Sequence, residues 1–189
     1  WFHVKGAEHV DRTRGGIFMG GHLGNWEWLA PAGGTAGFRT VIIVRSFDDP
    51  RMDRAVDAVR CSENVQTVDK NAASVNMMRQ LREGWSAGIL ADQSPRENGV
   101  PVQFFGAPAW ATVGPVLIAR RAKVPIYPVS MVRDEAGVYT LEFRPALELQ
   151  CTGDPLADLA ENTQRCQNAI ESMIREHPGQ WLWFHRRWR

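Results

Sequence analysis

The chain has 189 residues, of which 44% are hydrophobic and 23% are charged, and its formal net charge is +1. This length predicts a single domain over residues 1–189, and the balanced charge gives no electrostatic argument for nucleic acid as a partner. Three cysteines are too few for a disulfide framework, and no Cys-x-x-Cys or His-Glu-x-x-His spacing predicts a zinc site. No apolar run approaches the roughly 20 residues that a membrane-spanning helix needs. We therefore expect a globular domain without a metal or cofactor.

The first half of the chain alternates apolar runs with helical patterns. The run 17–20 lies between glycines and the run 40–44 is rich in β-branched residues, so both predict buried strands. Between them, the Ala-rich stretch 26–36 predicts a short helix with Asn25 as its N-cap. The elements expected next are a helix from Asp49-Pro50 to Arg60, a short strand over 65–68, a helix over 74–84 and a third buried strand over 86–91.

The second half continues the alternation and ends on the longest helical pattern. The apolar run 125–132 predicts a fourth strand, and the alternating stretch 138–143 predicts its antiparallel hairpin partner. One helix is expected after Thr112, and a longer amphipathic helix begins at Asp154-Pro155. Strands that alternate with helices indicate an α/β fold with a mostly parallel central sheet, flanking helices and an antiparallel hairpin.

The stretch His22-Leu23-Gly24-Asn25-Trp26-Glu27 follows the first buried strand. His22 is therefore expected at the carboxyl end of a strand, where open α/β sheets hold their ligands. Imidazole is the usual general base near pH 7, and a carboxylate on the following turn can bind one ring nitrogen while the other faces a substrate hydroxyl. Glu27 has the spacing for this role. The alternative is a histidine that caps the strand and a glutamate that stabilises a helix N-terminus.

Two more polar residues follow buried strands, Arg45 after the run 40–44 and Asp92 after the run 86–91. Polar groups at the carboxyl ends of neighbouring parallel strands can share one cleft, so we expect them to converge with His22. Asp92 is then either a second carboxylate that orients His22 or only the cap of a turn.

These residues resemble a known family. The stretch from His22 to Glu27 resembles the His-x4-Asp/Glu motif of the glycerolipid acyltransferase superfamily, and within it the chain is most similar to the lipid A biosynthesis (lauroyl/myristoyl) acyltransferases. Further stretches carry the likeness in the family's order along the whole chain. They are Val4-Lys5-Gly6-Ala7-Glu8-His9, Ala91-Asp92-Gln93, Val102-Gln103-Phe104-Phe105-Gly106-Ala107-Pro108, and the run from Pro178 to Trp188.

The resemblance implies a glycerolipid-acyltransferase-like fold and transfer of a fatty acyl chain from a thioester of acyl carrier protein to a hydroxyl of a lipid A precursor. It implies that His22 is the general base and Glu27 its orienting partner, without a covalent acyl-enzyme. Family members usually carry an N-terminal membrane anchor, and this sequence begins after the place where that anchor would lie. We therefore expect a membrane surface as a partner and the cytoplasmic face of the bacterial inner membrane as the location.

Acyl transfer also needs an oxyanion stabiliser, and a phosphorylated acceptor needs cationic partners. The backbone N–H groups near Gly24 and Asn25 are candidates for the oxyanion. Arg45 and Arg60 are candidates for phosphate because guanidinium matches its charge and geometry, and otherwise they are ordinary surface arginines. Gln93 lies in one of the matching stretches and is expected among the substrate-binding residues.

Two aromatic segments leave alternatives open. Phe104-Phe105 either lines a slot for the acyl chain or belongs to the core. The tail 180–189 interleaves Trp and Phe with Arg, which suits a bilayer interface, the acidic surface of a carrier protein or single-stranded nucleic acid. The same composition suits a C-terminal helix that packs its tryptophans on the sheet and exposes its arginines.

Two other functions stand beside the first. One is an acyltransferase that acts on another glycolipid, such as a phosphatidylinositol mannoside, with acyl-coenzyme A as donor. The other is a non-catalytic module that binds lipid or nucleic acid through the basic aromatic tail. A non-catalytic module would give no role to His22 and Glu27 at their characteristic spacing.

Overall fold

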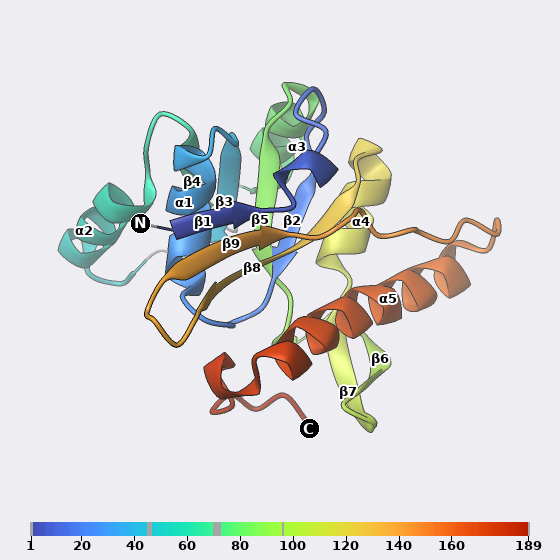
Figure 1. Cartoon of the computed structure of the whole chain (residues 1–189). Helices are drawn as coiled ribbons and strands as arrows, with labels where there is room; N and C mark the ends of the chain where they lie inside the picture. Colours follow the sequence, from blue (N-terminus) through green and yellow to red (C-terminus); the bar gives the residue numbers. More distant parts are fainter. Residues whose placement is uncertain (1, 45–46, 70–72, 96, 189) are drawn as a thin grey trace.

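The structure, a computed structural model, describes residues 2–44, 47–69, 73–95 and 97–188. Within these residues, a seven-stranded sheet forms the centre of a mixed α/β fold (Figure 1). All neighbouring strands are parallel except β8 and β9, so the predicted fold class is confirmed. The strands in spatial order are β1 (Phe2–Lys5), β9 (Tyr139–Phe143), β8 (Ile126–Arg133), β2 (Ile17–Gly20), β5 (Ser86–Leu90), β3 (Thr40–Val44) and β4 (Val65–Asp69).

Two of the helices, α2 (Pro50–Arg60) and α5 (Pro155–Glu176), begin at the aspartate caps that the sequence predicts. Asp49 accepts a hydrogen bond from the backbone N–H of Arg51, and Asp154 accepts from those of Leu156 and Ala157. Asn25 precedes a 3₁₀ turn, η2 (Trp26–Trp28), but its side chain makes no capping hydrogen bond. The other α-helices are α1 (Leu29–Thr35), α3 (Ala73–Arg82) and α4 (Gly114–Ala122), and the other 3₁₀ turns are η1 (Ala7–His9) and η3 (Pro178–Gln180).

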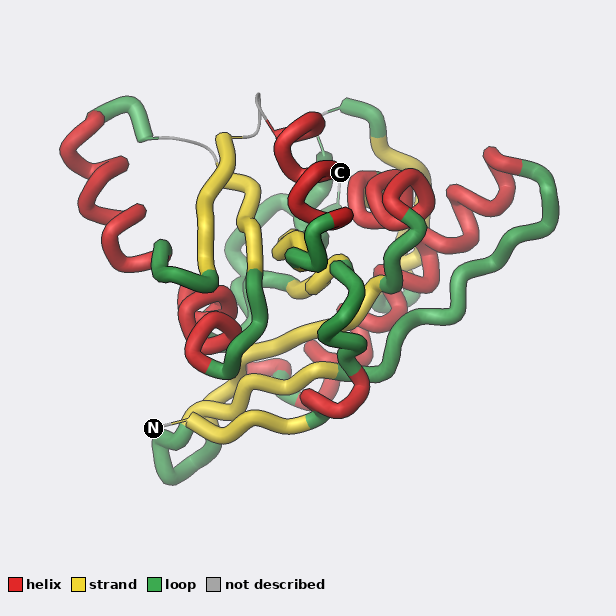
Figure 2. The backbone as a smooth tube through the Cα atoms, turned by 90° about the horizontal axis from the view of Figure 1, so that it is seen from above, coloured by secondary structure: helices red, strands yellow, loops and turns green. Residues whose placement is uncertain are grey.

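The two faces of the sheet carry separate hydrophobic clusters because side chains alternate along each strand. Ile17 and Met19 of β2 belong to the cluster that includes residues of α3, α4 and α5. Phe18, between them, belongs to the cluster that includes Ala32 of α1. The strands at the two ends of the sheet run in clearly different directions because the sheet is twisted (Figure 2). Helix α2 lies at the rim of the molecule and has no buried residue (Figure 1).

A separate antiparallel pair, β6 (Gly99–Phe104) and β7 (Ala107–Thr112), was not predicted as two strands. It is fixed to α5, because the Gln164 side chain accepts from the N–H of Gln103 at 2.7 Å and donates to its carbonyl at 2.8 Å. Phe104 is fully buried in the main core and Phe105 packs against that core. Of the two alternatives for Phe104-Phe105, the structure supports core packing.

The C-terminal segment is extended instead of helical. Trp181 pairs with Leu23 in an antiparallel bridge, with hydrogen bonds from the N–H of Gly24 to the carbonyl of Gln180 and from the N–H of Leu182 to that of His22, both 2.9 Å long. Trp181 and Arg187 are buried, whereas Trp183, Phe184 and Trp188 are exposed. The alternative of a C-terminal helix is therefore wrong, because this segment pairs with the loop after β2. Trp181 does pack in the core and Arg186 is exposed, as that alternative expected, but Arg187 is buried. Within the described residues, no helix has both the length and the apolarity to cross a membrane.

Candidate active site

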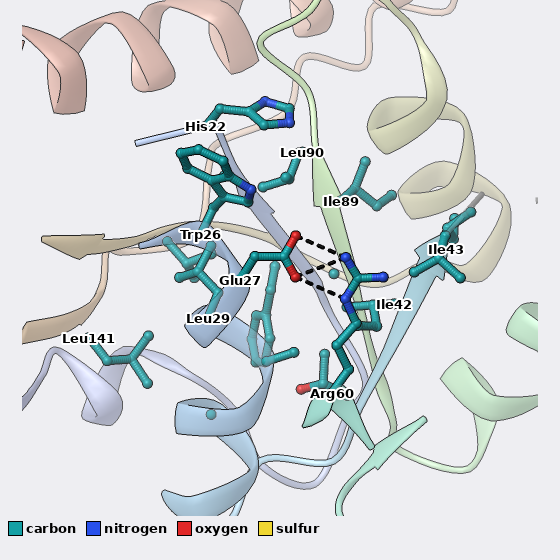
Figure 3. Close-up of a pocket in the computed structure, with 18 of the residues that line it drawn as sticks. His22, Trp26, Glu27, Leu29, Ile42, Ile43, Arg60, Ile89, Leu90 and Leu141 are labelled. Carbon is teal, nitrogen blue, oxygen red and sulfur yellow. Dashed lines mark hydrogen bonds and ion pairs between the residues drawn. The ribbon is translucent and has the colours of Figure 1, made fainter. Parts of the chain in front are cut away.

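A pocket of about 450 Å³ lies between α1 and the face of the sheet that carries Phe18 (Figure 3). Most of its lining is apolar. The polar groups gather near the carboxyl ends of the parallel strands, where His22 follows β2 and Glu27 lies in η2. The side chains of Phe18, Leu29, Ile42, Leu90, Val129, Leu141 and Phe143 supply much of the apolar wall.

His22 is held by Asp92, which follows the neighbouring strand β5. The Nδ1 of His22 lies 2.8 Å from Oδ1 of Asp92, and the backbone N–H of His22 donates to Oδ2 at 2.8 Å. The indole N–H of Trp181 donates to the same Oδ2 at 2.8 Å. Three donors thus converge on a carboxylate that is fully buried, while the side chain of His22 is 17% exposed to solvent. The structure therefore brings together His22 and Asp92, as expected from their positions at strand ends.

The surroundings of Asp92 favour its ionised form. Burial raises the pKa of Asp92, but the hydrogen bonds and charge of His22 and the indole hydrogen bond of Trp181 together lower it below the ordinary value of 3.8. An ionised carboxylate only accepts hydrogen bonds, so Nδ1 of His22 carries the hydrogen. In a neutral imidazole this leaves Nε2 without a hydrogen and able to take up a proton, which is the state that a general base requires.

Glu27 does not contact His22 in the way its spacing suggested. Its carboxylate forms a bidentate pair with Arg60, with Nε to Oε2 and Nη2 to Oε1 both at 2.9 Å. Figure 3 shows these two side chains pointing toward each other, with Ile42 beside Arg60. The expectation that Glu27 orients His22 is therefore corrected: the 3₁₀ turn η2 directs Glu27 to α2, and Asp92 occupies the orienting position. Arg60 lines the pocket, and its contact with a phosphate stays a prediction.

The backbone N–H groups predicted for the oxyanion are already used within the fold. The N–H of Gly24 donates to the carbonyl of Gln180, and that of Asn25 donates to the carbonyl of Met131 at 2.9 Å. Gly24 has a φ of +62°, and an added Cβ would lie 2.0 Å from the Met131 carbonyl oxygen. This glycine therefore allows close packing of two backbone segments, and the predicted oxyanion role of both N–H groups is wrong.

The remaining predicted residues fall in different places. The Gln93 amide nitrogen lies 3.5 Å from Nε2 of His22, to which it can donate a long hydrogen bond. Arg45 lies outside the described residues. Two residues without a predicted role also contact the site: Trp26 packs edge-on against the His22 ring at 5.2 Å between centroids, and Trp181 holds Asp92. Trp26 could have been found from the sequence, because it lies within the stretch from His22 to Glu27. Trp181 could not, because the composition of the tail suggested a membrane or protein interface and not a contact with Asp92.

The arrangement combines a base with an apolar cavity. Nε2 of His22 can take a proton from a hydroxyl, Asp92 can stabilise the imidazolium that forms, and the pocket has the size and apolar lining of a ligand site. In the part of the chain that the structure describes, no three His, Cys, Asp or Glu side chains are grouped as ligands for a metal ion.

Comparisons with known proteins show that the chain is similar to acyltransferases. A family model described as bacterial lipid A biosynthesis acyltransferase matches residues 1–189. Two relatives, each described as a phosphatidylinositol mannoside acyltransferase, come from the CDC 1551 / Oshkosh and ATCC 25618 / H37Rv strains of Mycobacterium tuberculosis. Each is 25% identical over 200 residues, which cover 98% of this chain and 59% of the relative. The chain thus spans somewhat more than half the length of these relatives.

Proposed function

The chain belongs to the bacterial lipid A biosynthesis acyltransferase family, and from this we propose that it transfers a fatty acyl chain from a thioester of acyl carrier protein to a hydroxyl of a lipid A precursor. One observation supports the proposal most directly. His22, oriented by the buried Asp92 carboxylate, lies at the polar end of an apolar pocket of about 450 Å³. A volume of this size lies in the range of small-molecule sites, about 300–1,000 Å³.

In the proposed reaction, Nε2 of His22 removes the proton from the acceptor hydroxyl as its oxygen attacks the thioester carbonyl. The tetrahedral intermediate collapses as the carbon–sulfur bond breaks, and the His22 imidazolium returns the proton to the departing thiolate. Asp92 stabilises the imidazolium between these two steps and keeps the ring in the required tautomer. The ester and the free thiol of the carrier are the products, and no covalent acyl-enzyme is needed.

The other polar groups have proposed roles that follow from their positions. The Gln93 amide lies beside Nε2 of His22 and replaces the backbone N–H groups as the candidate donor to the developing oxyanion. The Glu27–Arg60 pair holds a guanidinium at the rim of the pocket, where it can meet a phosphate of the acceptor. The apolar wall accommodates the acyl chain, which leaves its thioester end next to His22.

A bilayer surface at the cytoplasmic face of the inner membrane is the proposed place of action, because the lipid acceptor is found in a bilayer. Trp183, Phe184, Arg186 and Trp188 are all exposed in one short segment, and this mixture of aromatic and cationic side chains suits anionic lipid. We expect the chain to bind anionic vesicles and Phe184→Ser to bind them less, as measured by co-sedimentation. Equal binding of both proteins would contradict this part of the proposal.

A second candidate acceptor is a phosphatidylinositol mannoside, with acyl-coenzyme A as donor. The two mycobacterial relatives support it through their description, and the same His22 chemistry serves either acceptor. The identity of 25% is low, whereas the lipid A family model matches the chain from end to end, so we place this candidate second.

A transfer assay with two donors and two acceptors tests the proposal. The purified chain is incubated with tetradecanoyl thioesters of acyl carrier protein or coenzyme A, and with a phosphorylated lipid A precursor or a phosphatidylinositol mannoside. We expect the ester product of the carrier-protein donor and the lipid A precursor to form fastest. Faster acylation of the phosphatidylinositol mannoside would show that the second candidate is the preferred acceptor. If no donor and acceptor pair gives an ester, a non-catalytic lipid-binding module is favoured.

A further inference from the structure

Gly33 of α1 is unusual among the glycines of the chain. All 17 lie within the described residues, and an added Cβ would meet no atom within 4 Å at five of them. Four of these five, at positions 106, 137, 153 and 179, are exposed, so open space around them is expected. Gly33 is buried, and it lines the pocket. The open space beside this buried residue is therefore the interior of the pocket.

Neither packing nor backbone conformation requires a glycine at position 33. The other two glycines of the pocket wall are needed for packing, because an added Cβ would lie 2.8 Å from the Ile42 side chain at Gly88 and 3.0 Å from the Val129 carbonyl at Gly20. Gly33 has no positive φ, and it lies inside a helix, where glycine is less favourable than alanine. The missing side chain has one evident consequence, which is a larger pocket.

Gly33 lies at the end of the pocket away from His22. Helix α1 leads away from Glu27, and Gly33 is its last residue that lines the pocket. The Gly33 carbonyl accepts a hydrogen bond from the N–H of Phe38 at 2.9 Å. The Phe38 ring packs against Phe18 and Phe143, with centroids 5.7 and 4.6 Å apart, and these two rings close the pocket wall there.

We propose that Gly33 determines the length of the acyl chain that the enzyme transfers, because it leaves room for the terminal carbons of that chain. The inference rests on the proposed function and names the residue that limits the depth of the same pocket. A larger side chain at position 33 projects into the space that the terminal carbons would occupy. One methylene group in an apolar pocket changes selectivity about 10- to 200-fold, so even alanine has a measurable effect.

The test compares the wild type with Gly33→Ala, Gly33→Leu and a control, Thr35→Leu. Thr35 is exposed on the same helix and does not line the pocket, so the control adds a leucine without filling the cavity. Transfer rates are measured with carrier-protein thioesters of saturated chains from octanoyl to hexadecanoyl. The shift in Tm that each free fatty acid produces is measured on the same proteins and requires no catalysis.

We expect Gly33→Leu to shift the preferred chain to a shorter one and to lower the rate with the chain preferred by the wild type about tenfold or more. Gly33→Ala should shift the preference in the same direction by less, while Thr35→Leu keeps the wild-type profile. The same order should appear in the Tm shifts by fatty acids. Unaltered length profiles in both Gly33 variants would overturn the inference.

The two readouts separate this inference from the proposed function. If the wild type transfers no chain but is stabilised by fatty acids, the proposed function fails and the length dependence of the Tm shifts still decides the role of Gly33. If no fatty acid of any length stabilises the wild type and no acyl chain is transferred, the proposed function and the role of Gly33 are both wrong. Should Gly33→Leu not fold, Gly33→Ala decides, because alanine favours the helix.

Discussion

At the scale of single residues, the orientation of His22 depends on a carboxylate that is 70 positions away in the sequence. The spacing of Glu27 made it the expected partner, because a residue on the next turn is close in any helical geometry. In the structure, η2 turns Glu27 toward Arg60, while the parallel pairing of β2 and β5 brings Asp92 beside His22. The positions of His22 and Asp92 at strand ends therefore predicted the partner of His22 better than the short sequence distance from His22 to Glu27 did.

Replacing Asp92 by asparagine should lower the rate of acyl transfer about 10²- to 10⁴-fold, the scale seen when the orienting carboxylate of a catalytic histidine becomes an amide. The amide can donate to Nδ1, which would place the imidazole hydrogen on Nε2 and remove the base. Glu135→Gln makes the same chemical change on an exposed turn and serves as the control. A folded Asp92→Asn variant with the rate of Glu135→Gln would contradict the orienting role.

The lowered pKa of Asp92 also predicts how stability depends on pH. A carboxyl group whose pKa is lower in the folded than in the unfolded protein stabilises the fold above its unfolded pKa, about 3.9, and this contribution is lost as the pH falls through the folded pKa. The difference in unfolding free energy between wild type and Asp92→Asn should therefore shrink as the pH falls below about 4. Denaturant unfolding at several pH values below about 4 measures this difference, and a difference that grows as the pH falls over that range would contradict the lowered pKa of Asp92.

At the scale of elements, the C-terminal segment fastens the loop that carries Asp92. Arg187 is buried, donates to the Trp110 carbonyl and to Gln167 at 2.7 Å, and lies over the Phe104 ring. Gln167 of α5 in turn donates to the carbonyl of Ala91 at 2.9 Å. Burial lowers the pKa of Arg187, and the charge of Asp92 opposes that shift. This chain of contacts links the tail, α5 and the residue next to Asp92.

Arg187→Met should therefore destabilise the protein by about 2–4 kcal/mol, because the buried side-chain oxygen of Gln167 and the carbonyl of Trp110 lose their charged donor. Arg186→Met is the matched control, since Arg186 is the exposed neighbour in the same segment. Chemical denaturation of the two variants gives the comparison. Equal stability of both variants would show that the buried guanidinium contributes nothing to holding the segment.

The elements that the sequence predicted are those with strong local patterns. The β-branched run of β3 and the Asp-Pro starts of α2 and α5 determine their own structure, and the structure confirms them. The strand β7 escaped prediction because Ala and Pro, which are poor strand formers, occupy most of it. The extended tail escaped because its pairing partner, the loop after β2, lies at the other end of the chain.

At the scale of the whole molecule, the parallel sheet explains why a site forms at all. It collects the carboxyl ends of β2 and β5 at one edge, which brings His22 and Asp92 together, and it supplies the apolar face beneath them. This convergence could be predicted from the alternation of strands and helices. The pocket itself could not, because it depends on which side chains are missing, at Gly33 above all, and on how far α1 stands from the sheet.

One measurement tests the central claim most directly: the rate of acyl transfer from a carrier-protein thioester to a lipid A precursor, by wild type, His22→Ala and His3→Ala. His3 is an exposed histidine on the edge strand β1, so its replacement controls for the loss of an imidazole elsewhere. We predict a loss of about 100-fold or more in His22→Ala, the scale of removing a general base, and no loss in His3→Ala. A folded His22→Ala variant that forms product at the wild-type rate would contradict the account.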